Sequence, residues 1–255
     1  MTAAITQTTK KKQQQLDVNA TIESIWKRYL SSDLAPQILN RGISYFGNTK
    51  QQDVLITGMN PIYYPEREHT NNVYSFGGIL HTHTVDNYWK FLRTMLVSPL
   101  GHTDLRDCTT YLDLFYFREN SYDDFDKAFQ QNAKGKNFLQ EQLNLTRHIL
   151  ENIVQPKVIL VMSTEAASFW PRPSKKGPIN MGYDMKLIEG LPCGYVFQIT
   201  GLLNEGPFEN KKAKTNLKGT YVLFSSPITR LTRGDRKPTA RQIAMLLEKY
   251  EKNVG

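Results

Sequence analysis

The sequence has little cysteine and no long apolar run. Cys108 and Cys193 are the two cysteines of 255 residues, too few and too far apart for a disulfide framework or a CxxC metal pair. No run approaches the roughly 18 apolar residues that cross a bilayer, and the polar start of the chain lacks the apolar core of a secretory signal. We therefore expect a soluble, cytoplasmic protein with no membrane partner.

Several catalytic signatures are absent as well. The chain contains no Walker loop (GxxxxGK followed by Ser or Thr), no GxGxxG, no GxSxG and no HExxH. These motifs cradle phosphates, present a nucleophilic serine or hold zinc. Their absence excludes the commonest nucleotide-binding, serine-hydrolase and zinc-protease interpretations.

Acidic residues are fewer than basic ones. The chain has 24 Asp and Glu against 32 Lys and Arg, which gives a formal net charge of +8. The basic residues cluster at positions 10–12, 175–176, 211–214 and 230–237. Such an excess favours a polyanionic partner, although a charge run is often only a solvated surface. Whether these residues bind a polyanion or only form a solvated surface depends on where they lie in the fold.

The composition indicates one domain preceded by a tail. Residues 1–18 are polar and rich in Gln and Lys, with too little apolar surface to offset the entropy of ordering, and we interpret them as a disordered basic tail. Residues 19–255 are long enough, and with 40% hydrophobic residues in the chain apolar enough, for a single domain. No internal repeat is evident.

Short apolar runs alternate with helical patterns along this domain. Runs rich in β-branched residues predict strands at 53–58, 108–117, 157–163, 195–200 and 220–226. Apolar residues at helical spacing predict helices at 22–30, 87–97, 127–153, 164–170 and 238–250, and residues 204–219 are interpreted as a surface loop. Alternating strands and helices favour an α/β fold, a three-layer α/β/α sandwich with a four- or five-stranded, mostly parallel sheet.

Ligands of open parallel sheets bind beyond the carboxyl ends of the strands. In this chain that rule selects the segments at 58–66, 113–120, 163–170 and 225–235. The first of these, Gly58-Met59-Asn60-Pro61, resembles the GxNP motif of the mismatch-specific uracil and thymine glycosylases of the uracil-DNA glycosylase superfamily. Further features agree in order over residues 50–237: NYWKFL at 87–92, YLDL at 111–114, PKVILV at 156–161 and Ser-Pro at 226–227.

The resemblance implies an enzyme of DNA repair that hydrolyses the N-glycosidic bond of a damaged or mispaired base flipped out of DNA, either duplex or single-stranded. Asn60 would orient the attacking water through its amide oxygen, and Ser226 stands where many members have a His that stabilises the leaving base. We expect no metal, no cofactor and a monomer. The candidate base-binding residues are Gly58, Met59, Pro61, Tyr63, Tyr64, Phe76 and Asp113. In the alternative interpretation Asn60 caps a turn and the aromatic residues belong to the core.

Two departures bear on catalysis. Asp113 lies near the position where the family carries an Asn, and an ionised carboxylate only accepts hydrogen bonds, whereas an amide both donates and accepts. The hydroxyl of Ser226 is a weaker electrostatic partner for a leaving base than an imidazole. The sequence is therefore compatible with a slow glycosylase and with a catalytically inactive nucleic-acid-binding protein of the same fold.

The segment 225–237 combines cations and hydroxyls beside the expected active edge. Such side chains hold a duplex through its phosphates without reading its sequence. Leu231 lies between them and is a candidate wedge for the gap left by a flipped base, with ordinary packing as the alternative. The candidate backbone contacts are Ser225, Thr229, Arg230, Thr232, Arg233, Arg236 and Lys237.

A metal-dependent hydrolase is a second alternative. His81, His83 and Asp86 have the spacing of part of an HxHxxD ligand set, and His69 or His102 could add a ligand. The second group of ligands that such sites need is missing from the sequence, and histidines of the surface or the core are the competing interpretation.

Overall fold

Four of the predicted apolar runs form the parallel part of the main sheet. The computed structural model describes residues 17–47, 49–66, 72–81, 87–170, 179–203, 214–225 and 233–254. Strands β2 (Val54–Gly58), β4 (Thr109–Asp113), β5 (Val158–Val161) and β8 (Tyr221–Ser225) are all parallel and lie in the order β4-β2-β5-β8. Their apolar side chains are buried on both faces, as expected of a covered parallel sheet.

A hairpin extends this sheet to six strands. β7 (Gly194–Leu202) pairs with β8, and β6 (Tyr183–Leu191) pairs with β7, both antiparallel. The expectation of four or five strands is therefore one or two strands short, and the strand predicted at 195–200 is antiparallel to its neighbours. A parallel pair needs a long crossover, usually a helix, whereas β6 and β7 are joined by a two-residue turn.

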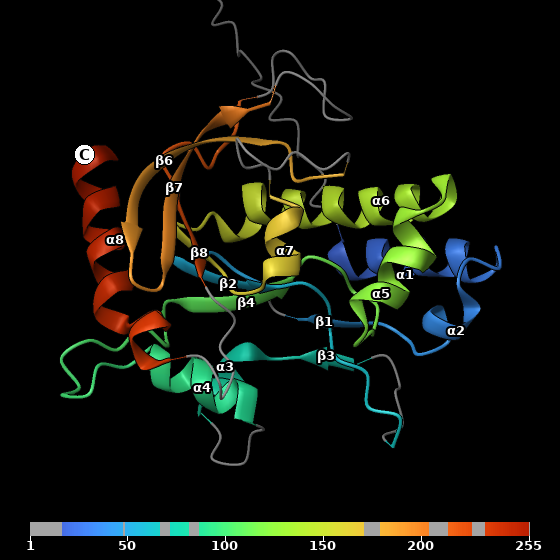
Figure 1. Cartoon of the computed structure of the whole chain (residues 1–255), viewed down its shortest axis with the longest axis horizontal. Coiled ribbons are helices and arrows are strands. Elements are labelled where there is room, and N and C mark those ends of the chain that lie inside the picture. Colours follow the sequence, from blue (N-terminus) through green and yellow to red (C-terminus); the bar gives the residue numbers. More distant parts are fainter. Residues whose placement is uncertain are drawn as a thin grey trace, which may run out of the picture.

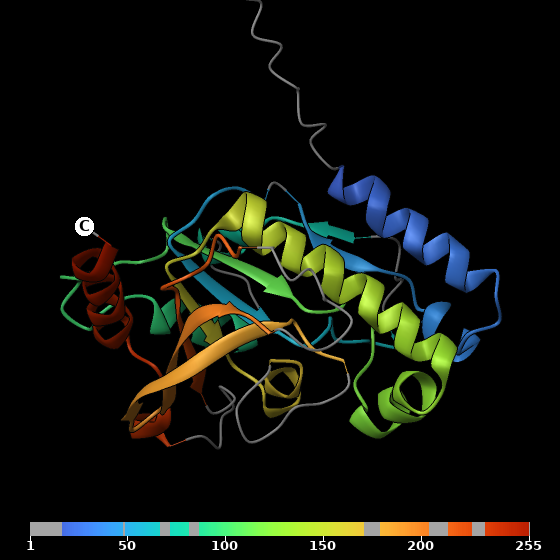
Figure 2. The same ribbon diagram turned by 90° about the horizontal axis from the view of Figure 1, so that it is seen from above.

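Helices cover the two faces of the sheet, so the three-layer α/β prediction is confirmed. One apolar cluster joins α1 (Val18–Leu30), α6 (Ala133–Ile149) and α7 (Thr164–Ser168) to one face of the strands. The other joins α3 (Phe76–His81), α4 (Asn87–Met95) and α8 (Ala240–Val254) to the opposite face. Figure 1 shows α1 and α6 above β2 and β4, and α3 and α4 below these two strands. Seen from above, α1 lies beside α6, and α8 is at the other end of the molecule (Figure 2).

The remaining elements are short. They are α2 (Pro36–Leu39), α5 (Tyr122–Phe125), the 3₁₀ turn η3 (Gly234–Arg236) and a small parallel sheet of β1 (Ser44–Phe46) and β3 (Asn72–Tyr74). The helix predicted at 127–153 is α6 flanked by two π-helical segments, η1 (Asp126–Gln130) and η2 (Leu150–Val154).

The N-terminal helix illustrates how local sequence sets these elements. The carboxylate of Asp17 caps α1 by accepting a hydrogen bond from the Ala20 backbone N–H at 3.0 Å. α1 therefore starts at the end of the segment predicted as a tail, whose residues 1–16 lie outside the described residues. Within the described part of the chain, no helix combines the length and the apolar character that crossing a membrane requires.

Candidate active site at the carboxyl ends of the parallel strands

Two of the predicted site segments leave adjacent strands side by side. Gly58 at the end of β2 is in register with Asp113 at the end of β4. Beyond the strands the two segments stay hydrogen-bonded, because the Phe115 N–H donates to Met59 O at 2.9 Å and the Glu119 N–H to Pro61 O at 3.1 Å. The structure thus brings the 58–61 motif and the 113–120 segment together at one edge of the sheet.

The side chain of Asn60 is held in one orientation by backbone carbonyls. Its Nδ2 donates to Glu119 O at 2.8 Å and to Pro61 O at 3.0 Å. Both amide protons are used in this way, and no described residue donates to Oδ1. The half-buried amide therefore presents a fixed acceptor, which is the group needed to orient a water molecule.

A network of polar side chains supports this loop. The Arg41 guanidinium forms an ion pair with Glu119 Oε2 at 2.6 Å and lies over the Tyr63 ring at 4.5 Å from its centroid. Glu119 Oε1 accepts from the backbone N–H groups of Asn120 and Ser121 at 2.7 and 2.9 Å. The Asn120 amide in turn binds both backbone groups of Tyr63, at 2.7 and 2.6 Å. The loop that carries Asn60 is therefore fixed at several points.

Asp113 is a buried carboxyl with one hydrogen-bond partner among the described residues. The Tyr111 hydroxyl donates to Asp113 Oδ1 at 2.8 Å, and the Tyr88 hydroxyl lies 3.2 Å from that of Tyr111. Burial raises the pKa of Asp113 to about 7, and the hydrogen bond from Tyr111 offsets part of this rise. Burial also raises the pKa of Tyr111 well above its ordinary value, so its hydroxyl keeps its proton as a donor.

Gly58 leaves the space that this arrangement needs. A Cβ at position 58 would overlap Tyr111 Oη and lie 2.5 Å from Asp113 Oδ1. No side chain can therefore be accommodated there without displacing the Tyr111–Asp113 hydrogen bond. The glycine of the motif therefore has a steric role in this site.

The three candidate stacking residues lie in different surroundings. Phe76 is 4% exposed and packs against Trp89 and Tyr111, with ring centroids 6.1 and 5.8 Å apart. Phe76 therefore belongs to the core, next to Tyr111, whose hydroxyl donates to Asp113. This position favours the core interpretation for Phe76. Tyr63 lies under Arg41, and both Tyr63 and Tyr64 are half-buried. Met59 packs against the core cluster of the α1 face.

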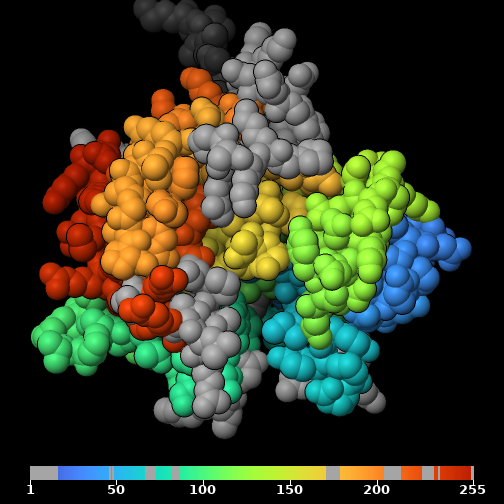
Figure 3. All heavy atoms as spheres, in the orientation of Figure 1, coloured from blue at the N-terminus to red at the C-terminus, as the bar shows by residue number. Residues whose placement is uncertain are grey.

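Part of the basic segment can be placed. Ser225 is the last residue of β8, while Ser226, Thr229, Arg230, Leu231 and Thr232 lie outside the described residues. Arg233 and Arg236 are exposed at η3, and the Lys237 ammonium lies 4.7 Å from the centre of the Phe91 ring of α4. The η3 and α4 regions adjoin on one face of the molecule (Figure 3).

The histidines among the described residues are dispersed over the structure. His81 Nε2 lies 3.4 Å from Asp107 Oδ1 at the surface, and His102 is exposed. His69, His83 and Asp86 lie outside the described residues. In the part of the chain that the structure describes, no three His, Cys, Asp or Glu side chains are grouped as metal ligands.

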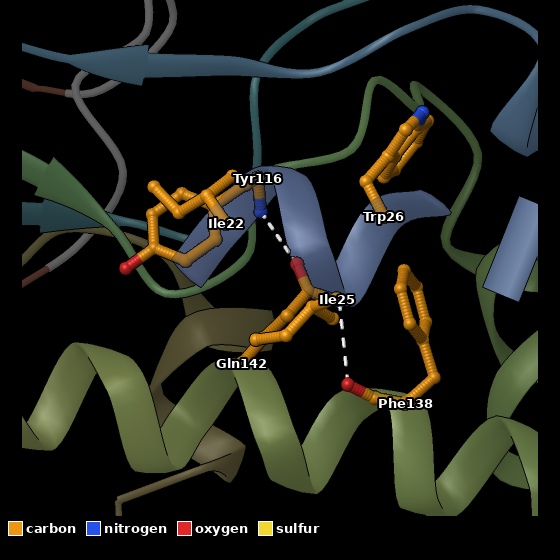
Figure 4. A pocket seen from close by; sticks show the side chains of 6 residues that line it. All are labelled: Ile22, Ile25, Trp26, Tyr116, Phe138 and Gln142. Carbon is orange, nitrogen blue, oxygen red and sulfur yellow. Dashed lines mark hydrogen bonds between the residues drawn. The ribbon is translucent and has the colours of Figure 1, made fainter. Parts of the chain in front are cut away.

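A pocket between α1 and α6 lies within the core. Figure 4 shows Gln142 donating to Phe138 O at 3.4 Å and accepting from the Tyr116 N–H at 2.9 Å. The side-chain amide of Gln142 is thus already hydrogen-bonded within the chain. The lining residues are Ile22, Ile25, Trp26, Tyr116, Phe138 and Gln142.

Several supporting residues were not among the sequence predictions. Tyr111 lies two residues before Asp113 and on the same side of β4, so strand alternation could have paired them. Arg41 and Glu119 are separated by 78 positions, and no local pattern links them.

No protein-family model, curated protein or solved structure matches the chain. We therefore infer function from the geometry and charges of this site.

Proposed function

We propose that the chain is a DNA glycosylase that removes a damaged or mispaired base of the uracil type by hydrolysis. The observation that carries the proposal is the orientation of Asn60. Two backbone carbonyls fix its amide at the carboxyl edge of a parallel sheet, with the oxygen left as an acceptor. This agrees with the role implied by the resemblance of residues 58–61 to the GxNP motif.

In the proposed reaction a water molecule donates a hydrogen bond to Asn60 Oδ1 and attacks the sugar carbon C1′. A C–O bond forms as the C–N glycosidic bond breaks, and the departing base keeps the electron pair of that bond. The water loses a proton to solvent, and the base is protonated from solvent. Because an amide is a very weak base, Asn60 orients the water without removing its proton, and we expect slow turnover.

The basic residues that follow β8 in the sequence support a DNA substrate. Arg233 and Arg236 are exposed at η3, and Lys237 comes directly after it. Phosphate contacts of this kind would hold the strand while the base is flipped. The predicted contacts at 226–232 precede these residues in the sequence and lie outside the described residues.

An inactive DNA-binding protein of the same fold is the alternative. Asp113 and Ser226 favour it, since both depart from the glycosylase pattern. The two functions differ in whether the glycosidic bond is broken, whereas both require salt-sensitive binding to DNA.

The test is base excision from labelled duplex and single-stranded oligonucleotides that each carry one uracil, one mismatched thymine or another damaged base. The glycosylase proposal predicts alkali-dependent strand scission with the wild type and its loss with Asn60→Ala, while DNA affinity is retained. Binding without scission for every base would overturn the enzyme proposal and favour the binding protein.

A further inference from the structure

Three large apolar side chains are exposed near the turn of the β6–β7 hairpin. Tyr195 is 59% exposed, Leu187 57% and Ile188 38%. Leu187 is paired with Phe197, which lies two residues after Tyr195 on β7, so Leu187 and Tyr195 project from the same face of the hairpin. Phe197 is buried in the cluster of the α1 and α6 face, so the cover given by the helices ends between Phe197 and Tyr195. We name Leu187, Ile188 and Tyr195 the hairpin face.

The Tyr195 ring is supported by backbone and open to solvent. Tyr195 is paired with Gly190, and a Cβ at position 190 would lie 3.7 Å from Tyr195 Cε1. Because the glycine has no side chain, the ring lies beside backbone at this point of the strand pair. An exposed aromatic ring held in this way is the kind of platform on which the bases of a single nucleic-acid strand stack.

The register of the sheet places Tyr195 at the edge that carries the candidate site. Tyr195 is paired with Phe224 of β8, and Phe224 with Val161 of β5. Val161 is paired in turn with Thr57 of β2, the residue before Gly58. This row crosses three strand spacings and is therefore about 14 Å long. About four stacked nucleotides of one strand span that distance.

Basic residues adjoin the hairpin turn. Cys193 Sγ in the turn lies 3.7 Å from Gln242 Oε1 of α8, so the turn contacts the start of this helix. Residues 233–241, which lead into α8, have four basic residues and one acid. The hairpin and the η3 region adjoin on one face of the molecule (Figure 3). The exposed cations are Arg233, Arg236 and Arg241.

The acids of β6 already have partners within the chain. Asp184 accepts a hydrogen bond from the Thr200 hydroxyl at 3.0 Å, and Glu189 forms an ion pair with Lys249 of α8. Lys186 of the same strand is exposed. The surroundings of the hairpin face are therefore suited to an anionic partner.

We propose that the hairpin face binds the single DNA strand that leads into the candidate site, with an unpaired base stacked on Tyr195 and its phosphates beside the cations of 233–241. The inference rests on the proposed DNA substrate and adds a contact region about four nucleotides away from the base that is excised. It also makes single-stranded DNA the preferred form, because the bases of a duplex are stacked on one another and leave no face for Tyr195.

A second copy of the chain is a less suitable occupant. β6 is the edge strand of the sheet, and edge strands can pair with another chain. Its pairing with β7 has register shifts at 184–185 and at 187–189. Irregularities of this kind twist an edge and disfavour the addition of a further strand.

The experiment measures the affinity of the full chain for a labelled oligothymidylate of about 12 nucleotides and for a duplex of equal length, by fluorescence anisotropy. Tyr195→Ala should bind the single strand at least about fivefold more weakly and the duplex as the wild type does. Tyr195→Phe keeps the ring and should stay within about twofold of the wild type. Leu100→Ala, which removes another exposed apolar side chain, is the matched control and should change neither affinity. Thermal melting verifies that each variant is folded.

Equal single-strand affinities of wild type and Tyr195→Ala overturn the inference. Sedimentation tests the other occupant, since a wild-type dimer that becomes a monomer in Tyr195→Ala would show that the hairpin face binds a second copy, and the inference would fail. Neither readout requires excision. Binding that depends on Tyr195 without excision of any base would reject the proposed enzyme alone, and excision with equal affinities would reject the hairpin face alone.

Discussion

Gly58 and Asp113 lie opposite each other in the register of two parallel strands, and the absence of a side chain at one makes room for the carboxyl of the other. The Tyr111 hydroxyl occupies the same space and is hydrogen-bonded to that carboxyl. The glycine that opens the motif and the acid on the neighbouring strand therefore form one structural unit.

Substitution of this glycine should disrupt the unit. We expect Gly58→Ala to lower the free energy of unfolding by about 2–3 kcal/mol, because the added Cβ overlaps Tyr111 Oη and approaches Asp113 Oδ1. Removing the hydroxyl relieves one of these overlaps, so Tyr111→Phe should cost less in the Gly58→Ala background than in the wild type. Urea unfolding of the four proteins measures this coupling, and additive effects would contradict the proposed overlap.

The stability of the chain should depend on pH through Asp113. Its pKa rises from an ordinary value of 3.8 to about 7 in the folded chain, so the folded state holds this proton more tightly than the unfolded state does. Ionisation of Asp113 should therefore lower the free energy of unfolding as pH rises from about 4 through about 7, by on the order of 4 kcal/mol.

Asp113→Asn isolates this effect because the amide carries no titrating proton. The stability of the variant relative to wild type should increase over the same pH interval and level off above it. Urea unfolding at a series of pH values measures the difference. A difference that stays constant with pH would show that Asp113 titrates normally in the folded protein.

The loop around Asn60 should depend on Asn120. Asn120→Ala removes two hydrogen bonds to the Tyr63 backbone and should cost about 1 kcal/mol, since the site is exposed. If the loop positions Asn60, excision should slow about tenfold with little change in DNA affinity. Asn137→Ala, at an exposed position of α6, is the matched control. Equal rates in the two variants would separate Asn120 from catalysis.

The basic segment should determine the salt dependence of DNA binding. Replacing Arg233, Arg236 and Lys237 by Gln should reduce the slope of log affinity against log salt by between about 1 and 3, one phosphate contact contributing about 0.9. The control replaces Lys50, Lys218 and Lys252, three exposed lysines of which the first two precede β2 and β8. A similar change in both triple variants would indicate a diffuse charge effect in place of a defined surface.

The sequence predicted the parallel centre of the sheet better than its edge. Runs such as VLITG and VILV are apolar throughout and identify buried strands. β6 reads YDMKLIEGL, in which buried residues occur only at its beginning, so its signal is weak. The π-helical segments beside α6 were missed because one or two turns of wider hydrogen bonding barely change the apolar spacing.

The candidate site was predictable where its residues directly follow a recognisable strand. The 58–61 motif and Asp113 could be assigned to neighbouring strand ends from the α/β pattern. The Arg41–Glu119 pair and the hydrogen bonds of Asn60 to Glu119 O arise from tertiary contacts without a local signature. The raised pKa of Asp113 likewise depends on burial, and it changes the interpretation of an acid that was expected to accept hydrogen bonds only.

Single-turnover excision of uracil at about pH 6 by wild type, Asn60→Ala and Asn60→Asp tests whether Asn60 orients the attacking water. At this pH the neutral form of Asp113 predominates. The alanine variant removes the acceptor. The aspartate variant replaces the amide NH₂ group, which donates to both Glu119 O and Pro61 O, with a single oxygen atom. We expect excision by the wild type and at least about 100-fold slower excision by both variants, with unchanged affinity for DNA. Excision by Asn60→Ala at the wild-type rate would show that Asn60 does not orient the water.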